Sequence, residues 1–222
     1  WIPTLYFAQG LPYVVVMTLA VIMFKRLGIN NTDIALYTSW LYLPWVIKPL
    51  WSPLVDIVKT KRWWVITMQL VIGGGLAGIA LTLPGPHAFR YSLAFMWLLA
   101  FSSATHDIAA DGFYMLGLDT KKQAFFVGIR NTAYRLAMLT GQGLIVMFAG
   151  WLEKTYSSTP PEEIAVPRAW SVTFYLLAIL FVLLFLYHQF ILPKPENDIP
   201  MKNGNPLNAF FQTFITFFQK KG

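Results

Sequence analysis

The sequence predicts an all-α membrane protein: a bundle of six transmembrane helices followed by a short amphipathic helix. Of the 222 residues 56% are hydrophobic and only 12% are charged, whereas a soluble domain usually carries about 25% charged residues. The apolar residues form six long stretches, and most cations lie between them. A water-soluble fold of this size could not bury so much apolar surface, so the expected solvent is a lipid bilayer.

Each apolar stretch is long enough to cross the hydrocarbon core, which takes about 20 mostly apolar residues in a helix that satisfies its own backbone hydrogen bonds. The six stretches are residues 4–24, 33–55, 63–83, 89–111, 123–152 and 169–192. Turn-forming residues separate them, including Gly28 after the first, Pro84 after the third and Pro160 after the fifth. We therefore expect residues 1–192 to form one transmembrane bundle.

A polar linker is expected from residue 193, where Pro, Asn and acidic residues replace the apolar run. Within residues 193–222 apolar and polar side chains then alternate at helical spacing, and Pro206 suits a first helical position. We predict a short amphipathic helix on the cytoplasmic face, with a disordered tail as the alternative. Because the chain opens at Trp1 and ends in this connection, we expect a piece of a longer protein whose C-terminal bundle is missing.

The distribution of cations predicts the orientation, since short cytoplasmic loops are enriched in Lys and Arg. One set of loops holds Lys59, Lys61, Arg62, Lys121, Lys122, Lys194, Lys202, Lys220 and Lys221. The other holds only Lys25, Arg26, Arg90, Lys154 and Arg168. Both termini of the chain are therefore expected in the cytoplasm, and the net charge of +7 is attributed to topology rather than to nucleic-acid binding.

Several ionisable side chains lie within the predicted spans, where a charge costs roughly 2.5–3.5 kcal/mol on insertion scales. They are Lys48, His106, Asp107, Asp111, Arg130 and Arg135. Such residues usually face a partner or a water-filled cavity. They are the first candidates for a functional site.

Proton coupling is predicted for Asp107 and Asp111, which lie four residues apart on one helical face. Of two neighbouring carboxylates in a low dielectric, at least one tends to keep a proton, as a proton carrier must. The alternative for Asp111 is a static ion pair with Arg130. His106 is a third candidate, with a hydrogen-bonded interhelical histidine as its alternative. Metals and cofactors are not expected, because cysteine is absent and no HExxH motif is present.

Substrate binding is predicted for the fifth span and its neighbours. Arg135 cannot shed its proton, so it must meet an anionic substrate group or a fixed carboxylate. Lys48 could do the same or extend to the interface. Tyr134, Asn131 and Gln9 could hydrogen-bond a substrate, although such residues also link helices. No catalytic constellation is present, so an enzyme is not expected.

The loop 52–62 resembles the GxxxDRxGRR signature of the major facilitator superfamily, with matches at Asp56, Lys61 and Arg62. The departures are Ser52, Ile57, Lys59 and Thr60. In that family the acidic residue and the cations latch the cytoplasmic ends of helices in the outward-facing state. The resemblance implies such a latch here, in which we include Arg130.

Four further stretches are similar, in order and spacing, to the AmpG family of muropeptide permeases. They are YFAQGLPY (6–13), IKPLWSPLVD (47–56), AFSSATHDIAADGF (100–113) and AYRLAMLTGQGL (133–144). A lysine on helix two, Asp-x-x-x-Asp on helix four and Tyr-Arg on helix five recur in that family. The resemblance thus falls on Lys48, Asp107, Asp111, Tyr134 and Arg135.

This resemblance implies the first half of a carrier with twelve spans in two six-helix halves and alternating access around a midplane site. The implied activity is proton-driven import of anhydromuropeptides, which are anionic sugar-peptides, across the bacterial inner membrane for peptidoglycan recycling. The expected partners are that substrate, protons and the bilayer, with the full-length protein acting as a monomer. Two alternatives remain: a related carrier of another large anion, such as an acyl-CoA or a siderophore, and a six-span enzyme or scaffold.

Overall fold

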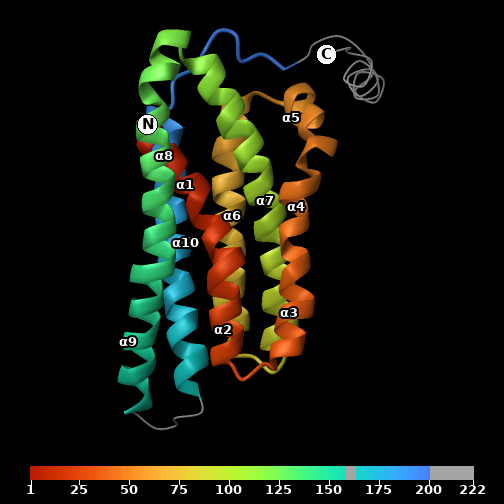
Figure 1. The fold of residues 1–222 in the computed structure, drawn as a ribbon, viewed down its shortest axis with the longest axis vertical. Coiled ribbons are helices and arrows are strands. Elements are labelled where there is room, and N and C mark those ends of the chain that lie inside the picture. Colours follow the sequence, from red (N-terminus) through yellow and green to blue (C-terminus); the bar gives the residue numbers. More distant parts are fainter. Residues whose placement is uncertain (159–163, 201–222) are drawn as a thin grey trace.

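The computed structural model describes residues 1–158 and 164–200, and over these residues every regular element is a helix. The helices run up and down a single bundle (Figure 1). Five continuous helical segments are long and apolar enough to cross a membrane: Ile2–Arg26, Lys61–Thr82, Ala88–Gly117, Thr120–Ser157 and Ala165–Ile191. The predicted all-α membrane fold is confirmed for this part of the chain. The predicted amphipathic helix lies outside the described residues.

Two of the five segments contain a π-helical turn. The first segment comprises α1 (Ile2–Val14), η1 (Val15–Leu19) and α2 (Ala20–Arg26). The fourth comprises α8 (Thr120–Leu139), η4 (Thr140–Ile145) and α9 (Val146–Ser157). The other three are α6 (Lys61–Thr82), α7 (Ala88–Gly117) and α10 (Ala165–Ile191).

The predicted span 33–55 differs from the others because it is a broken helix. It consists of α3 (Asn31–Ser39), the 3₁₀ turn η2 (Trp40–Tyr42), α4 (Leu43–Ile47), the 3₁₀ turn η3 (Lys48–Leu50) and α5 (Ser52–Val58). Pro44, Pro49 and Pro53 lie in this stretch, and each lacks an N–H and crowds the carbonyl four residues earlier. Over residues 1–158 and 164–200 the structure therefore has five continuous spans, and the remaining predicted stretch is broken into α3, α4 and α5, which follow one another beside α7 (Figure 1).

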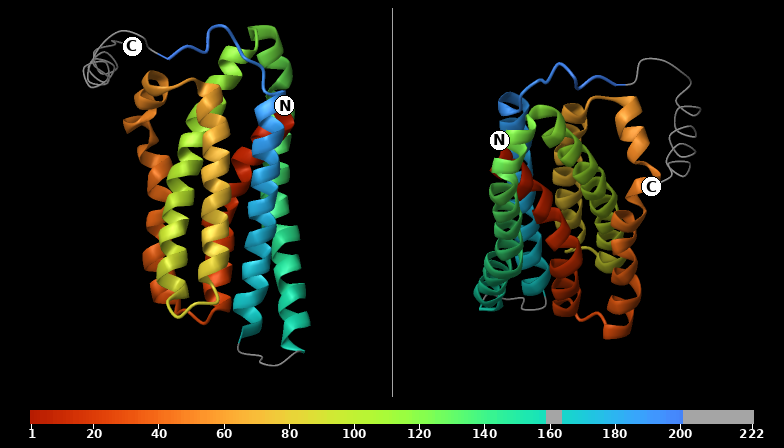
Figure 2. Two further views of the ribbon diagram at one scale, coloured as in Figure 1. Left: turned by 180° about the vertical axis from the view of Figure 1, so that it is seen from behind. Right: turned by 45° about the horizontal axis from the view of Figure 1, so that its top comes forward.

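Close helix packing holds the bundle together. α6 lies between α7 and α10, while α1 lies against α7 and α8 (Figure 2). Where α1 meets α8, a Cβ at Gly10 would lie only 2.9 Å from the Cβ of Ala137, and where α1 meets η4, a Cβ at Gly141 would overlap Val14. Small residues permit this approach of two backbones, on which helix association in lipid depends.

Buried apolar side chains fill the interior, among them Phe24, Leu76, Phe174 and Phe181. At one end of the bundle, Glu153 of α9 is buried and accepts hydrogen bonds from Arg26 Nε (2.8 Å) and Trp170 Nε1 (2.7 Å). This contact ties α2, α9 and α10 together. The polar residues of the candidate site are thus held on a packed scaffold.

The connections separate into two ends. The first residue, the α5–α6 connection and the α7–α8 connection lie at the upper end in Figure 1, and the α2–α3 and α6–α7 connections lie at the lower end. At the upper end the α5–α6 connection holds Lys59 and the first turn of α8 holds Lys121, both from the larger of the two predicted cation sets. Because the broken segment α3 to α5 also runs from the lower to the upper end, the first residue and the end of α10 lie at the same end of the bundle (Figure 1).

Candidate functional site

Asp107 of α7 lies within the bundle and faces the broken segment. Its carboxylate Oδ2 is 3.8 Å from Nζ of Lys48, with side-chain exposures of 12% and 35% respectively. The break in the helix places Lys48 on the 3₁₀ turn η3, beside α7. A single charge within a transmembrane segment is costly, and a nearby opposite charge compensates part of that cost. The structure thus brings together Asp107, which is predicted to carry the proton, and Lys48, which is predicted to bind the substrate.

Gln9 of α1 and Trp45 of α4 also approach the Asp107 carboxylate. Gln9 Oε1 and Trp45 Nε1 are buried and have no hydrogen-bond partner among the described residues. We call Asp107, Lys48, Gln9 and Trp45 the Asp107 cluster. It offers one cation, one anion and the unpaired acceptor Gln9 Oε1 to a ligand.

Asp111, one turn further along α7, belongs to a second group, the Asp111 cluster, with Tyr6, Arg130 and Tyr114. The Tyr6 hydroxyl donates to Asp111 Oδ1 at 3.1 Å, and Arg130 donates to the Tyr6 oxygen, also at 3.1 Å. The guanidinium lies 3.8 Å from Asp111 Oδ1 and stacks over the rings of Tyr6 and Tyr114. The alternative left open by the sequence, a pairing of Asp111 with Arg130, is therefore seen in the structure.

His106 lies on a hydrogen-bonded chain that links α7, α6, α10 and α1. His106 Nε2 is 3.2 Å from Gln69 Nε2, Gln69 Oε1 is 3.0 Å from His188 Nδ1, and His188 Nε2 is 3.0 Å from Thr4 Oγ1. The exposures of His106, Gln69 and His188 are 1%, 0% and 0%. Sequence analysis missed His188, although a histidine inside an otherwise apolar span is itself a signal.

The remaining predicted substrate residues lie on α8. Tyr134 is half-buried and packs against Gly10 of α1. Asn131 and Arg135 are exposed, and Arg135 makes no ion pair within residues 1–158 and 164–200. The structure thus joins Lys48 and Gln9 to Asp107 and leaves Arg135 open to a ligand or to another part of the protein.

Three of the four predicted latch residues lie at the upper end of the bundle: Asp56, Lys61 and Arg62. The fourth, Arg130, belongs to the Asp111 cluster. Lys61 pairs with Asp56 across the α5–α6 connection. The carboxylate of Asp198, in the segment after α10, accepts hydrogen bonds from the backbone N–H groups of Lys61 (2.7 Å) and Arg62 (2.9 Å), so it caps α6. The Arg62 guanidinium donates to the carbonyls of Gln189 and Leu192 at the end of α10. Sequence analysis did not assign this role to Asp198.

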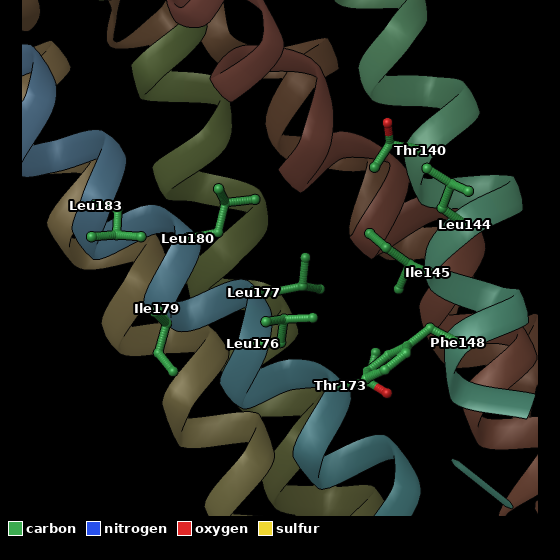
Figure 3. Close-up of a pocket in the computed structure, with 10 residues that line it drawn as sticks. All are labelled: Thr140, Leu144, Ile145, Phe148, Thr173, Leu176, Leu177, Ile179, Leu180 and Leu183. Carbon is green, nitrogen blue, oxygen red and sulfur yellow. The ribbon is translucent and has the colours of Figure 1, made fainter. Parts of the chain in front are cut away.

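A separate groove of about 390 Å³ runs between η4–α9 and α10 (Figure 3). Its lining is apolar apart from two threonine hydroxyl groups, and none of the predicted site residues contributes to it. The lining residues are Thr140, Leu144, Ile145, Phe148, Thr173, Leu176, Leu177, Ile179, Leu180 and Leu183. Such a surface suits hydrocarbon rather than an anionic substrate.

Comparison with known proteins identifies the family. The family model described as Major Facilitator Superfamily matches residues 4–220. The chain belongs to this superfamily. The predicted resemblance is thereby confirmed, and because major facilitator proteins are transporters, membership favours transport over enzymatic activity.

Individual relatives refine the comparison. The chain is 26% identical to the anhydromuropeptide permease of Escherichia coli K12, over 92% of this chain and 40% of that protein. It is 27% identical to an uncharacterised protein of Haemophilus influenzae, over 97% of this chain and 48% of that protein. It is also 27% identical to an uncharacterised protein of Schizosaccharomyces pombe, over 62% of this chain and 27% of that protein. The major facilitator chain thus spans less than half the length of these relatives.

Proposed function

We propose that this chain forms the N-terminal half of a proton-coupled major facilitator carrier that imports anhydromuropeptides across the bacterial inner membrane. The observation that carries the proposal is the Lys48–Asp107 ion pair, which lies inside the bundle between a broken helix and α7. The permease relative of E. coli supports the substrate class. The proposed orientation has both ends of residues 1–222 in the cytoplasm, because the larger cation set lies on that side.

Exchange of counter-ions gives the proposed mechanism. When a proton binds the Asp107 carboxylate, the negative charge is lost and the Lys48 ammonium needs another anion. A carboxylate of the sugar-peptide can take that place, so proton and substrate bind together. When the substrate leaves, the ammonium again favours the ionised carboxylate, and Asp107 releases its proton. The charge in the membrane interior stays balanced at each step.

The other candidate residues are assigned supporting roles in the proposal. Arg135, exposed on α8, binds a second substrate carboxylate, and Gln9, Tyr134 and Asn131 hydrogen-bond the sugar or peptide. Asp111 is the second proton-binding candidate, although its contacts with Tyr6 and Arg130 also join α7 to α1 and α8. Asp56, Lys61 and Arg62 hold the cytoplasmic ends of the helices.

Uptake of a labelled anhydromuropeptide into vesicles that contain the full-length protein tests the proposal. Accumulation should fall when an uncoupler dissipates the proton gradient. Asp107→Asn should abolish accumulation, and Arg135→Ala should raise the KM for substrate. Asp119→Asn, which changes a carboxylate in the exposed α7–α8 connection, is the matched control. Undiminished accumulation with the uncoupler would refute proton coupling, and stronger competition by an acyl-CoA or a siderophore would refute the proposed substrate.

A further inference from the structure

Three aromatic side chains pack together beside the Lys48–Asp107 ion pair. The ring of Tyr13, on α1, meets the ring of Trp45, on α4, at nearly a right angle, with centroids 5.1 Å apart. The ring of Tyr42, on η2, stacks on Trp45 with centroids 6.5 Å apart and planes 22° from parallel. We call Tyr13, Tyr42 and Trp45 the aromatic group. It adjoins the Asp107 cluster, because Trp45 belongs to both.

The aromatic group lies deep in the membrane rather than at its surface. Tyr13 is near the middle of the 25-residue span Ile2–Arg26, so about 16–20 Å of helix separates it from either end. Tyrosine and tryptophan are enriched at the two membrane surfaces, where the polar end of each ring reaches water. That reason does not apply in the middle of a span, so the position of these rings needs another explanation.

Three tyrosine hydroxyls in this region have no hydrogen-bond partner in the part of the chain that the structure describes. Tyr13 lies near Tyr42 and Asp107, and Tyr134, on α8, lies near Tyr13 and Asp107. The hydroxyl of Tyr6, by contrast, is hydrogen-bonded on both sides. Hydrocarbon cannot satisfy a hydroxyl group. The three unpaired hydroxyls are therefore available to a polar ligand.

A sugar ring matches this combination of groups. One face of a pyranose presents C–H groups, whose partial positive charge suits the negative face of an aromatic ring. The edge of the pyranose carries hydroxyls, which donate and accept hydrogen bonds as tyrosine hydroxyls do. Tyr42 is the most open member of the aromatic group, with 45% of its surface exposed. A purely apolar guest could cover its ring but would leave the hydroxyls unpaired.

We propose that the aromatic group is a sugar-binding subsite, in which a pyranose ring of the substrate packs on Tyr42 and its hydroxyls bond to Tyr42 and Tyr13. The inference rests on the proposed function and deepens it, because it divides the substrate between two adjacent points. Lys48 binds a carboxylate, and the aromatic group binds the sugar. Trp45 joins the two, since its indole N–H approaches Asp107 while its ring contacts both tyrosines.

Uptake into vesicles that contain the full-length protein tests the inference with a labelled anhydromuropeptide and, as unlabelled competitor, the same peptide without its sugar. Tyr42→Leu removes the ring, so it should raise the KM for the anhydromuropeptide about three- to tenfold and leave inhibition by the sugar-free peptide unchanged. Tyr42→Phe keeps the ring, so its KM should rise by a smaller factor. Tyr37→Leu is the matched control: Tyr37 is 43% exposed, but its ring packs on Phe89, so neither value should change.

The possible results separate the subsite from the proposed function. If the KM is unchanged in both Tyr42→Leu and Tyr13→Leu, the subsite is refuted and the proposed function stands. The subsite is also refuted if the sugar-free peptide competes as well as unlabelled anhydromuropeptide does, or if Tyr42→Leu weakens inhibition by both to the same extent. If uptake ignores the uncoupler while Tyr42→Leu still raises the KM selectively, the proposed proton coupling fails and the sugar-binding subsite stands.

Discussion

Removing Lys48 should destabilise the protein because Asp107 would remain as an unpaired anion. Lys48→Met keeps the apolar stem and removes the ammonium. Breaking a buried pair by deleting one partner costs about 3–5 kcal/mol. Here the atoms are 3.8 Å apart and 35% of the Lys48 side chain is exposed, so water screens part of the interaction and we expect a loss of about 1–2 kcal/mol.

A double-mutant cycle isolates this interaction, with the free energy of unfolding of the full-length protein measured in detergent. Asp107→Asn alone should lower the free energy of unfolding less than Lys48→Met does, because the Lys48 ammonium that it leaves behind can reach water. The double variant should be no less stable than Lys48→Met, since it leaves no buried charge. We therefore expect a coupling free energy of about 1–2 kcal/mol.

The control is Lys122→Met, which breaks an ion pair with Asp119 whose side chains are 65% and 56% exposed. The loss in free energy of unfolding should be about 0–1 kcal/mol, which is typical of surface ion pairs. If the effects of Lys48→Met and Asp107→Asn simply add, within about 0.5 kcal/mol, the two residues do not stabilise each other. The counter-ion exchange proposed for transport would then lose its physical basis.

Three further predictions concern the scaffold. Glu153→Gln weakens the acceptor for Arg26 and Trp170, so it should lower the free energy of unfolding by about 1–2 kcal/mol, measured in detergent. Asp198→Asn removes a carboxylate that caps α6, so hydrogen exchange at the first amides of α6 should quicken by about the fivefold that 1 kcal/mol implies. Gly141→Val should lower the melting temperature by overlap with Val14, and Val14→Ala should restore part of it.

Hydropathy was sufficient to locate most of the fold. The predicted stretches 63–83 and 169–192 correspond to α6 and α10 with shifts of a few residues at their ends. The prediction of one continuous helix over residues 33–55 was wrong. Hydropathy is averaged over a window of residues, so it does not detect the prolines that lack a backbone N–H and break the helix. Its three prolines are visible in the sequence and would have predicted the breaks.

The candidate site was predictable mainly as a set of residues, and only the pairing of Asp111 with Arg130 was named from the sequence, as an alternative. The cost of burying charge identified Lys48, Asp107, Asp111 and Arg130 without alignment or structure. It could not decide which cation meets which carboxylate, because that depends on the rotation and depth of separate helices. The position of His188 inside an apolar span marks it in the sequence, but its pairing with Gln69 could not be predicted, because the two residues lie 119 positions apart.

The position of α7 links these observations. On this one helix Asp107 pairs with Lys48 and, one turn on, Asp111 contacts Tyr6, while His106 is bonded to Gln69 on a different face. A rotation of α7 that separated Asp107 from Lys48 would also pull His106 from its buried partner. Loss of the ion pair by protonation involves no such rotation, because only a proton moves. The packing therefore favours a mechanism in which proton binding and substrate binding are coupled by a change of charge on an α7 that stays in place. It disfavours a mechanism in which α7 rotates about its axis.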